Sequence, residues 1–375
     1  MASLVLSDYR RLVVKVGSSL LVDEHGELNR RWLQTLAHDL GALQQDGHEI
    51  LIVSSGAIAI GSSILGINKR RARLEELQAA AAAGQVQLVH AYQESLGAHG
   101  IRAAQVLLTP DDTENRRRFL NARGTLGQLL KHSVIPIINE NDTVATDEIR
   151  YGDNDRLAAR VAQLVMADAL VLLSDVDGFY TADPGKDAGA EHIPEVSRIS
   201  SEMQAMAGET RSAIGSGGMA TKVQAARIAT HAGCSTVIAS GTIEHPLREL
   251  ARGARCTVFR AEGTPAVARK QWLAGALDVQ GKLTVDEGAA RALGKGNSLL
   301  PVGVVAITGD FRRGDVVELY GADGAVLGRG LAEYSGSDAA SIAGCQSEQI
   351  EEILGHRGRT VMIHRDELVL FDHDD

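Results

Sequence analysis

The sequence contains few of the residues that mark several common protein classes. Aromatic residues make up only 3% of 375 residues, so valine, isoleucine, leucine and alanine must form the core. The three cysteines include no CxxC pair, which argues against a disulfide framework or a zinc site. No apolar run reaches the roughly 18 to 20 residues that span a bilayer, and no basic segment precedes an apolar one at the N-terminus. We therefore expect a cytoplasmic protein without membrane association.

Acidic and apolar residues are plentiful. The net charge of −10 argues against broad binding to nucleic acids or anionic membranes. Hydrophobic residues make up 44% of the chain, which is long enough for two or three domains. The 40 glycines accompany regular apolar periodicity, which indicates tight functional loops rather than disorder.

The first two thirds of the chain alternate between short apolar runs and longer stretches with helical spacing. Continuous apolar runs predict strands that are buried on both faces, and their alternation with helices predicts a mostly parallel sheet between helical layers. In such sheets, ligands bind beyond the carboxyl ends of the strands. The predicted strands lie at 12–19, 49–56, 103–109, 134–142, 169–175 and 235–241, and the clearest helices at 30–46, 74–96 and 222–232.

The periodicity changes near residue 260, which predicts a second domain. We expect an α/β domain over 1–262 and a linker over 263–279. Shorter apolar segments with RRGD and ADG turns then predict a small, mainly β domain over 280–360, followed by a C-terminal strand and tail over 361–375.

Two strand ends carry small polar residues that suit a phosphate. Lys15 lies inside an apolar run, and taken alone it is more often a lysine that extends from a strand end. The small residues Gly17, Ser18 and Ser19 that follow favour a phosphate near the backbone. Ser54 and Ser55 lie before Gly56 where a helix is predicted to begin, which is either an anion site or an ordinary helix cap.

The segment GSGGMATK at 215–222 is a glycine-rich loop that opens a helix. It fits the dinucleotide pattern G-x-G-x-x-A only superficially, because no strand precedes it and no acid follows about twenty residues later. It suits a loop that closes over nucleotide phosphates, with Lys222 as a point charge, and the alternative is a hinge without a ligand. Ser174 and Asp175 end another strand and also suit a nucleotide, whereas the calcium-loop pattern is incomplete there.

The stretch INENDTVATDEIRYGDND at 138–155 is densely acidic. Charge runs are usually solvated loops, but the absence of histidine disfavours zinc, and the end of the stretch opens a predicted helix. Asp142 and Asn154 suit the recognition of a substrate ammonium and carboxylate.

Seven segments occur together in an order that is highly specific. They are VVKVGSSLL, IVSSGAIAIG, RFLNARGTL, PIINENDTVAT, GDNDRLAA, LLSDVDGFYTADP and GSGGMATKVQAA. With them the chain resembles the glutamate 5-kinases of the amino-acid kinase family, and residues from about 280 to 358 resemble a PUA domain. The resemblance implies a three-layer α/β/α sandwich with a mostly parallel central sheet, plus a small mainly β PUA-like domain.

The resemblance implies a reaction and a set of site residues. The reaction is phosphorylation of the L-glutamate side chain by ATP with Mg²⁺, the first step of proline biosynthesis, and L-proline is implied as an inhibitor. Lys15 and Lys222 are implied as catalytic residues, and the glutamate-binding residues as Ser55, Asp142 and Asn154. The implied ATP-binding residues are Lys15, Ser174, Asp175, Ser216, Gly217, Gly218, Met219, Ala220, Thr221 and Lys222. The residues that hold a metal are not assigned.

Two alternatives differ from this interpretation. One is a related kinase that acts on another carboxylate, on carbamate or on UMP. The other is an RNA-binding protein that acts through the PUA-like domain, which is disfavoured because residues 280–375 hold only nine basic residues against sixteen acidic ones. The resemblance also implies a homo-oligomer, a dimer or a tetramer.

Overall fold

The computed structural model describes residues 6–23, 25–69, 71–144, 154–208, 218–275 and 278–371. The chain divides into two compact units. Unit 1 comprises Met1–Glu114 and Asn121–Pro265, and unit 2 comprises Asn115–Leu120 and Ala266–Asp375. Each unit is described by itself below.

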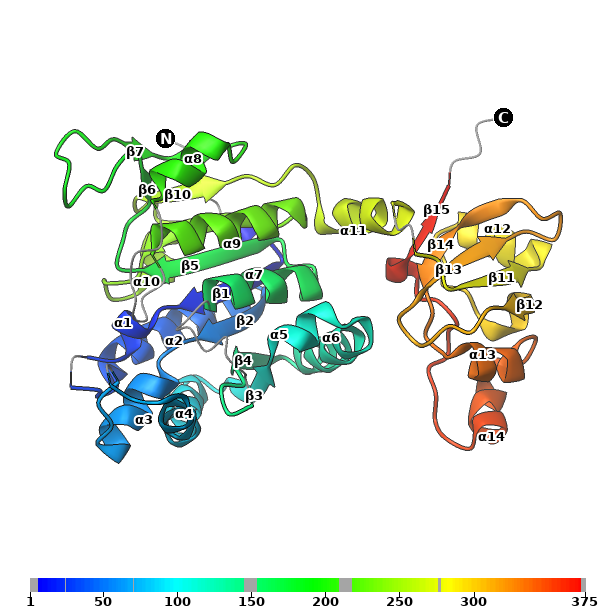
Figure 1. The fold of residues 1–375 in the computed structure, drawn as a ribbon, viewed down its shortest axis with the longest axis horizontal. Coiled ribbons are helices and arrows are strands. Elements are labelled where there is room, and N and C mark those ends of the chain that lie inside the picture. The colour runs from blue at the N-terminus through cyan, green and yellow to red at the C-terminus, as the bar shows by residue number, and fades with distance from the viewer. Residues whose placement is uncertain are drawn as a thin grey trace. The chain divides into compact units, whose positions relative to one another are not determined.

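The centre of unit 1 is a sheet with the strand order β3-β4-β2-β1-β5-β9-β10-β8 (Figure 1). Its strands pair in parallel except where β10 runs antiparallel to β9. The predicted α/β fold with a mostly parallel sheet is therefore confirmed. The strands are β1 (Arg11–Val16), β2 (Glu49–Ser54), β3 (Arg102–Leu108), β4 (Val134–Glu140), β5 (Ala169–Ser174), β8 (Glu195–Val196), β9 (Ser235–Ser240) and β10 (Cys256–Phe259).

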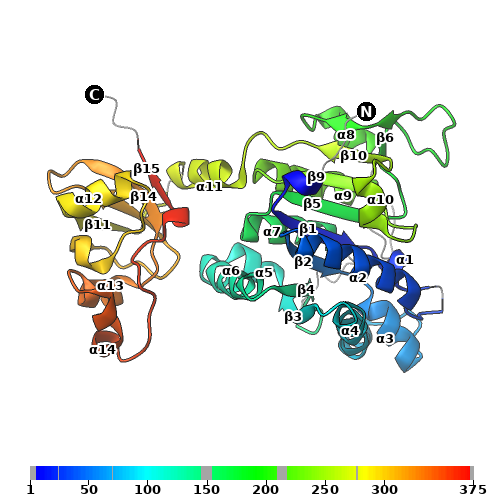
Figure 2. The same cartoon turned by 180° about the vertical axis from the view of Figure 1, so that it is seen from behind.

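Helices cover both faces of this sheet. On one face, α2 (Arg30–Gln45), α4 (Leu74–Gly97) and α10 (Pro246–Ala251) share a core with alternate strand residues such as Val14 and Ile52. On the other face, α7 (Asn154–Val165) and α9 (Met219–His231) pack against each other and contact the strands β1, β5 and β9 (Figures 1 and 2). The three layers follow from strands whose side chains are apolar on both faces.

Two glycines let helix α3 (Ala57–Leu65) pack closely on α4. A Cβ atom at Gly61 would lie 1.7 Å from the carbonyl oxygen of Ala80, and one at Gly84 would lie 1.9 Å from that of Ala57. No side chain fits at either position, so the two backbones touch there. This contact fixes α4 beside the turn at the end of β2, where Gly56 has a φ of 110° that favours glycine.

Shorter elements complete unit 1. The helix α6 begins with residues that belong to unit 2 and continues into unit 1. The elements are η1 (Leu6–Asp8), α1 (Ser18–Leu21), α5 (Pro110–Glu114), α6 (Arg116–Lys131), β6 (Phe179–Tyr180), β7 (His192–Ile193) and α8 (Ser201–Met206). The strands β6 and β7 form a separate antiparallel pair.

Unit 2 contains a second, smaller sheet with the order β12-β11-β13-β14-β15. Its pairs are antiparallel except β11 with β13, and its own core gathers around residues such as Leu283, Phe311 and Ile363. Its strands are β11 (Gly281–Val285), β12 (Val304–Thr308), β13 (Val316–Tyr320), β14 (Val326–Leu331) and β15 (Leu368–Leu370). Its helices are α11 (Pro265–Ala274), α12 (Glu287–Gly294), η2 (Pro301–Gly303), α13 (Gly336–Ile342), η3 (Ser347–Gln349), α14 (Ile350–Leu354) and η4 (Arg365–Glu367).

The segment over 263–279 that we expect as a linker contains helix α11, most of which belongs to unit 2. A search of the described helices finds none with both the length and the apolar character needed to cross a membrane.

Candidate active site

Lys15 extends from the sheet toward helix α7. It lies between Val14 and Val16, which both join the core beneath α2. Because side chains alternate along a strand, Lys15 points to the opposite face of the sheet. Its side chain is buried, and its Nζ lies 2.6 Å from Oδ1 of Asp155, the second residue of α7. The structure therefore pairs a buried ammonium with a buried carboxylate.

A second lysine reaches the same carboxylate from helix α9. Lys222 lies in the first turn of α9 and is buried, and its Nζ is 3.3 Å from Oδ2 of Asp155. The hydroxyl of the preceding residue, Thr221, donates to Oδ2 at 2.8 Å. Asp155 is therefore held by β1 on one oxygen and by α9 on the other.

Two lysine side chains and one carboxylate meet in this buried cluster. Burial alone would raise the pKa of Asp155, but the charges of Lys15 and Lys222, with hydrogen bonds from Lys15 and Thr221, hold that pKa below its ordinary value. Asp155 is thus a carboxylate at neutral pH, and two ammonium groups converge on it. Ammonium groups gathered at one point favour an anionic ligand.

A network of neutral groups surrounds Asn154, the residue next to Asp155. The Asn154 amide donates to Ser55 Oγ at 2.8 Å and lies 3.1 Å from both the Ser54 carbonyl and Asn139 Oδ1. The Asn139 amide in turn donates to Oε1 of Gln85, from α4, at 2.8 Å. These bonds join the ends of β2 and β4 to the start of α7 and fix the orientation of the Asn154 amide.

The side chain of Tyr92 also contacts this network. Its hydroxyl lies 3.1 Å from Ser54 Oγ, and both side chains are buried. Burial raises the pKa of Tyr92, against the smaller opposing effect of the hydrogen bond with Ser54. The hydroxyl is therefore neutral and acts only as a hydrogen-bonding group.

Asp142 lies just beyond β4 and lines a pocket of about 160 Å³. The pocket also contacts Gln85, Gln105 and the loop that follows β4. Desolvation by burial raises the pKa of Asp142 to about 6. Among the described residues, Asp142 makes no hydrogen bond or ion pair with the Asn154 network, so the structure places it near that network but does not join the two.

Gln85 connects the network to the pocket. Its side chain is buried, and its Nε2 has no hydrogen-bond partner within the described part of the chain. The same side chain lines the pocket beside Asp142, so Gln85 contacts both the network and the pocket.

The other predicted residues lie at the end of β5 and at the start of α9. The Ser174 hydroxyl donates to Asp175 Oδ1 at 2.8 Å, and Asp175 is exposed at the end of β5, the neighbour of β1 in the sheet. Gly218 precedes α9 without a side-chain cap, and Met219 and Ala220 follow it. Ser216 and Gly217 lie outside the described residues.

The structure thus gathers the predicted Lys15, Thr221 and Lys222 around one carboxylate, and the predicted Ser55 and Asn154 around one amide. The sequence interpretation did not assign Asp155, Asn139 or Gln85. Asn139 and Asp155 are the first and last residues of the NEND and GDND segments, which was a usable signal, whereas nothing in the sequence around Gln85 indicates its position.

Known proteins resemble this chain over nearly its whole length. Residues 10–240 match the amino acid kinase family and residues 281–354 match the PUA domain. The chain belongs to the amino acid kinase family. That family was predicted from the order of its motifs, and the match confirms it.

Three curated relatives are similar over almost all of both chains. "Glutamate 5-kinase" from Paramagnetospirillum magneticum is 56% identical over 366 residues, which cover 97% of this chain and 99% of that protein. "Glutamate 5-kinase" from Bradyrhizobium diazoefficiens is 54% identical and covers 99% of this chain and 100% of that protein. "Glutamate 5-kinase 1" from Rhizobium meliloti is also 54% identical, over 97% of this chain and 93% of that protein. The predicted resemblance to these members of the amino acid kinase family is confirmed.

The chain is also similar to a solved structure, "Carbamate kinase from Giardia lamblia bound to AMP-PNP". The two share 15% sequence identity with a TM-score of 0.48, over 68% of this chain and 100% of that chain.

Proposed function

We propose that this chain transfers the γ-phosphoryl group of ATP to the side-chain carboxylate of L-glutamate, giving L-glutamyl 5-phosphate and ADP. Curated relatives with more than half of their residues identical carry the name glutamate 5-kinase. The observation in the structure that carries the proposal is the pair of buried lysines that meet on one carboxylate, because two ammonium groups at one point suit a transferring phosphoryl group.

The reaction joins two anions, and the lysines offset their repulsion. A glutamate side chain has an ordinary pKa of about 4.3, so the attacking oxygen is already ionised at neutral pH and needs no general base. That oxygen forms a bond to the γ-phosphorus while the bond from the γ-phosphorus to the bridging oxygen of ADP breaks. Lys15 and Lys222 stabilise the charge on the phosphoryl oxygens, and each contact contributes about 3 to 4 kcal/mol by analogy with single oxyanion donors.

Asp155 positions the two lysines and does not accept a proton. Its carboxylate stays ionised because the ammonium charges hold its pKa low. The start of α9 adds N–H groups after Gly218, where no side chain caps the helix. We assign the segment from Ser216 to Lys222, with Ser174 and Asp175, to the nucleotide.

Mg²⁺ supplies charge neutralisation to the nucleotide phosphates in kinases. It prefers oxygen ligands and is usually held by one or two carboxylates together with phosphates and water. Asp155 is already held between two lysines, whereas Asp175 is an exposed carboxylate at the same edge of the sheet. The donor type at Asp175 fits this ion, and we assign Asp175 to it.

We assign L-glutamate to the neutral network and the pocket beside it. Ser55 and Asn154 offer hydrogen bonds that do not repel a dianion, and Asp142 offers a carboxylate for the substrate ammonium. Desolvation of Asp142 supports this assignment, because a half-buried carboxylate that meets no cation among the described residues gains most from an ammonium ligand.

We propose that residues 1–262 carry out the kinase reaction and that residues 280–360 form an accessory PUA-like domain, with the bounds expected from the sequence. The two compact units support this division. Inhibition by L-proline and assembly into a homo-oligomer are further parts of the proposal. The first is measured by the assay below, and the second by light scattering during gel filtration.

A trapping assay tests the reaction. The purified full chain is incubated with MgATP, hydroxylamine and one acceptor at a time: L-glutamate, N-acetylglutamate, L-aspartate, carbamate or UMP. Hydroxylamine converts an acyl phosphate into a coloured hydroxamate, so we expect colour with L-glutamate and its suppression by L-proline. Colour or ADP release only with another acceptor would contradict the proposed substrate, and no turnover with any acceptor would contradict the proposed activity.

A further inference from the structure

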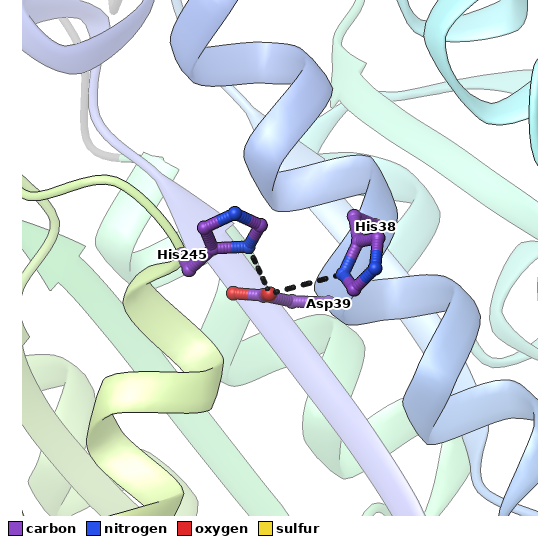
Figure 3. Close-up of side chains that lie close together, drawn as sticks. All are labelled: His38, Asp39 and His245. Atoms are coloured by element: carbon purple, nitrogen blue, oxygen red, sulfur yellow. Dashed lines mark hydrogen bonds and ion pairs between the residues drawn. The ribbon is translucent and has the colours of Figure 1, made fainter.

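Two histidines and an aspartate converge on the face of the sheet covered by α2, away from the candidate active site. His38 and Asp39 lie on α2, and His245 immediately precedes α10. His245 Nδ1 lies 2.7 Å from Asp39 Oδ1, and His38 Nδ1 lies 3.8 Å from the same oxygen. The carboxylate lies between the two imidazole rings (Figure 3). One ligand atom from each of the three residues lies within 4.8 Å of the others.

The rest of the structure fixes the carboxylate of Asp39. Its side chain is 1% exposed, and its second oxygen accepts hydrogen bonds from the backbone N–H groups of Leu247 and Arg248, each at 3.1 Å. These bonds orient Oδ1 toward the two histidines before any ligand arrives. Hydrogen bonds of this kind orient the ligands of known metal sites in proteins.

Neighbouring aromatic rings also constrain His38. Its ring packs edge-on against His245, with 5.2 Å between ring centroids, and against His99 at 5.6 Å. Asp39 caps helix α10. This role explains why its second oxygen accepts two backbone hydrogen bonds and why Asp39 forms a hydrogen bond with His245. It does not account for His38, whose Nδ1 faces the same oxygen at a distance too long for a hydrogen bond.

We propose that His38, Asp39 and His245 bind a divalent transition-metal ion, with Zn²⁺ as the best match. Two imidazole nitrogens and one carboxylate oxygen form a donor set that zinc and its neighbours in the first transition row accept, whereas Mg²⁺ and Ca²⁺ prefer oxygen donors alone. Zinc binds these atoms at about 2.0 to 2.2 Å, so the three atoms must lie within roughly 4.4 Å of one another. The two distances to Asp39 Oδ1, 3.8 Å from His38 Nδ1 and 2.7 Å from His245 Nδ1, already lie within that range.

Binding requires the other tautomer of one ring. The hydrogen bond with Asp39 places a proton on Nδ1 of His245, and a metal ion on that nitrogen requires the neutral tautomer with the proton on Nε2. The ion would then join α2 to the residue that begins α10. Three protein ligands leave at least one coordination position for water.

This site is separate from the proposed position of Mg²⁺. The cluster lies on α2 and just before α10, which pack on one face of the sheet, whereas Asp175, the residue assigned to Mg²⁺, directly follows the end of β5. A transition metal bound to the cluster therefore differs from the nucleotide's ion in both ligands and location.

Calorimetric titration of the full chain with ZnCl2, after removal of metals with a chelator, tests the site. We expect one equivalent to bind to the unmodified chain. His38→Ala is expected to weaken that binding at least tenfold, and because this side chain is 54% exposed its removal leaves the fold intact. His90→Ala is the matched control, since it also removes an exposed histidine from a helix, α4, and is expected to bind like the unmodified chain.

A second measurement identifies the ligands. Co²⁺ bound by imidazole and carboxylate in a low-coordinate site gives a visible absorption band, which we expect in the unmodified chain and in His90→Ala but not in His38→Ala or His245→Gln. Equal loss of zinc binding in His38→Ala and His90→Ala would indicate scattered surface binding and would overturn the proposal. So would the absence of a stoichiometric site in the unmodified chain.

Discussion

Asp155 Oδ1 lies 2.6 Å from Lys15 Nζ, and both groups are buried. Lys15 lies on β1, the first strand in the sequence, and Asp155 lies at the start of a helix 140 positions later. The ion pair therefore holds together two elements that are far apart in the sequence. The buried carboxylate also accounts for the two lysines that lie in the interior, because the Nζ atom of each meets it there.

Asp155→Asn is expected to lower both stability and turnover. The substitution keeps the size of the side chain but leaves Lys15 and Lys222 without their anion. Breaking a buried ion pair costs about 3 to 5 kcal/mol of unfolding free energy, and the misplaced lysines should lower kcat by about 100-fold or more. Chemical denaturation and the hydroxamate assay measure the two effects.

Asp183→Asn is the control for that experiment. Asp183 also pairs with a lysine, Lys186, at 2.7 Å, but on the surface. Exposed pairs contribute about 0 to 1 kcal/mol, so this variant should retain the stability and turnover of the unmodified chain. Equal behaviour of the two variants would show that the Asp155 cluster has no special role.

Asp142→Asn is expected to weaken glutamate binding and to stabilise the fold at neutral pH. The lost charge–ammonium contact corresponds to about 1.5 to 3 kcal/mol, or roughly a 10- to 100-fold increase in KM. Burial raises the pKa of Asp142 to about 6, so its protonated form stabilises the fold at low pH, and that contribution is lost as pH rises through about 6. At pH 7, removal of the charge should add roughly 1 to 3 kcal/mol to the unfolding free energy.

The pH profile separates this role from a general effect. For the unmodified chain, kcat/KM for glutamate should fall as pH drops below about 6, because protonated Asp142 no longer attracts the ammonium group. In Asp142→Asn that fall should be absent between about pH 5.5 and 6.5. A profile that is the same in both proteins would assign the ionisation to another group.

Gln85→Leu is expected to raise KM for glutamate more than it lowers kcat. It leaves the buried Asn139 amide without its acceptor, which costs about 1 to 2 kcal/mol and disturbs Asn154 in turn. We expect KM to rise about 5- to 20-fold and kcat to change less than about threefold. Gln87→Leu, an exposed position two residues further along α4, should leave both constants unchanged. A fall in kcat alone would mean that Gln85 does not act through Asn154.

Gly84→Ala is expected to destabilise unit 1. Its Cβ would lie 1.9 Å from a backbone oxygen of α3, so the two helices must separate, at a cost of about 1 to 3 kcal/mol. Gly97→Ala lies on the same helix with nothing within 4 Å of the added atom, so it should be neutral or stabilise by up to about 1 kcal/mol. Thermal unfolding followed by circular dichroism compares the two. A neutral Gly84→Ala would show that the α3–α4 contact adjusts freely.

The sequence predicts the layers of unit 1 well because the patterns that indicate them lie within short segments of the chain. A strand such as β5 is apolar at consecutive positions, which only burial on both faces explains. The polar residue that ends such a strand, Ser174 for example, then lies at the edge where ligands bind. The three helices expected at 30–46, 74–96 and 222–232 match α2, α4 and α9 within a few residues.

The remaining features depend on partners that are distant in the sequence. Asp155 looks like an ordinary residue in the first turn of a helix until Lys15 and Lys222 are placed beside it. The antiparallel pairing of β10 with β9 depends on the path of the chain rather than on composition. The close approach of Gly61 and Gly84 depends on two helices meeting at those positions, and no local pattern distinguishes these glycines from the others.

Asn154 and Asp155 are consecutive residues, and each anchors a different half of the candidate site. Consecutive Cα atoms are held about 3.8 Å apart by the peptide bond, and reacting atoms must approach to about 3 to 3.5 Å. In the proposed assignment, the peptide bond between Asn154 and Asp155 therefore limits how far apart the glutamate and phosphoryl positions can lie. A single residue inserted between them would rotate one side chain about 100° around the helix axis, which would separate the two halves without changing any residue of either.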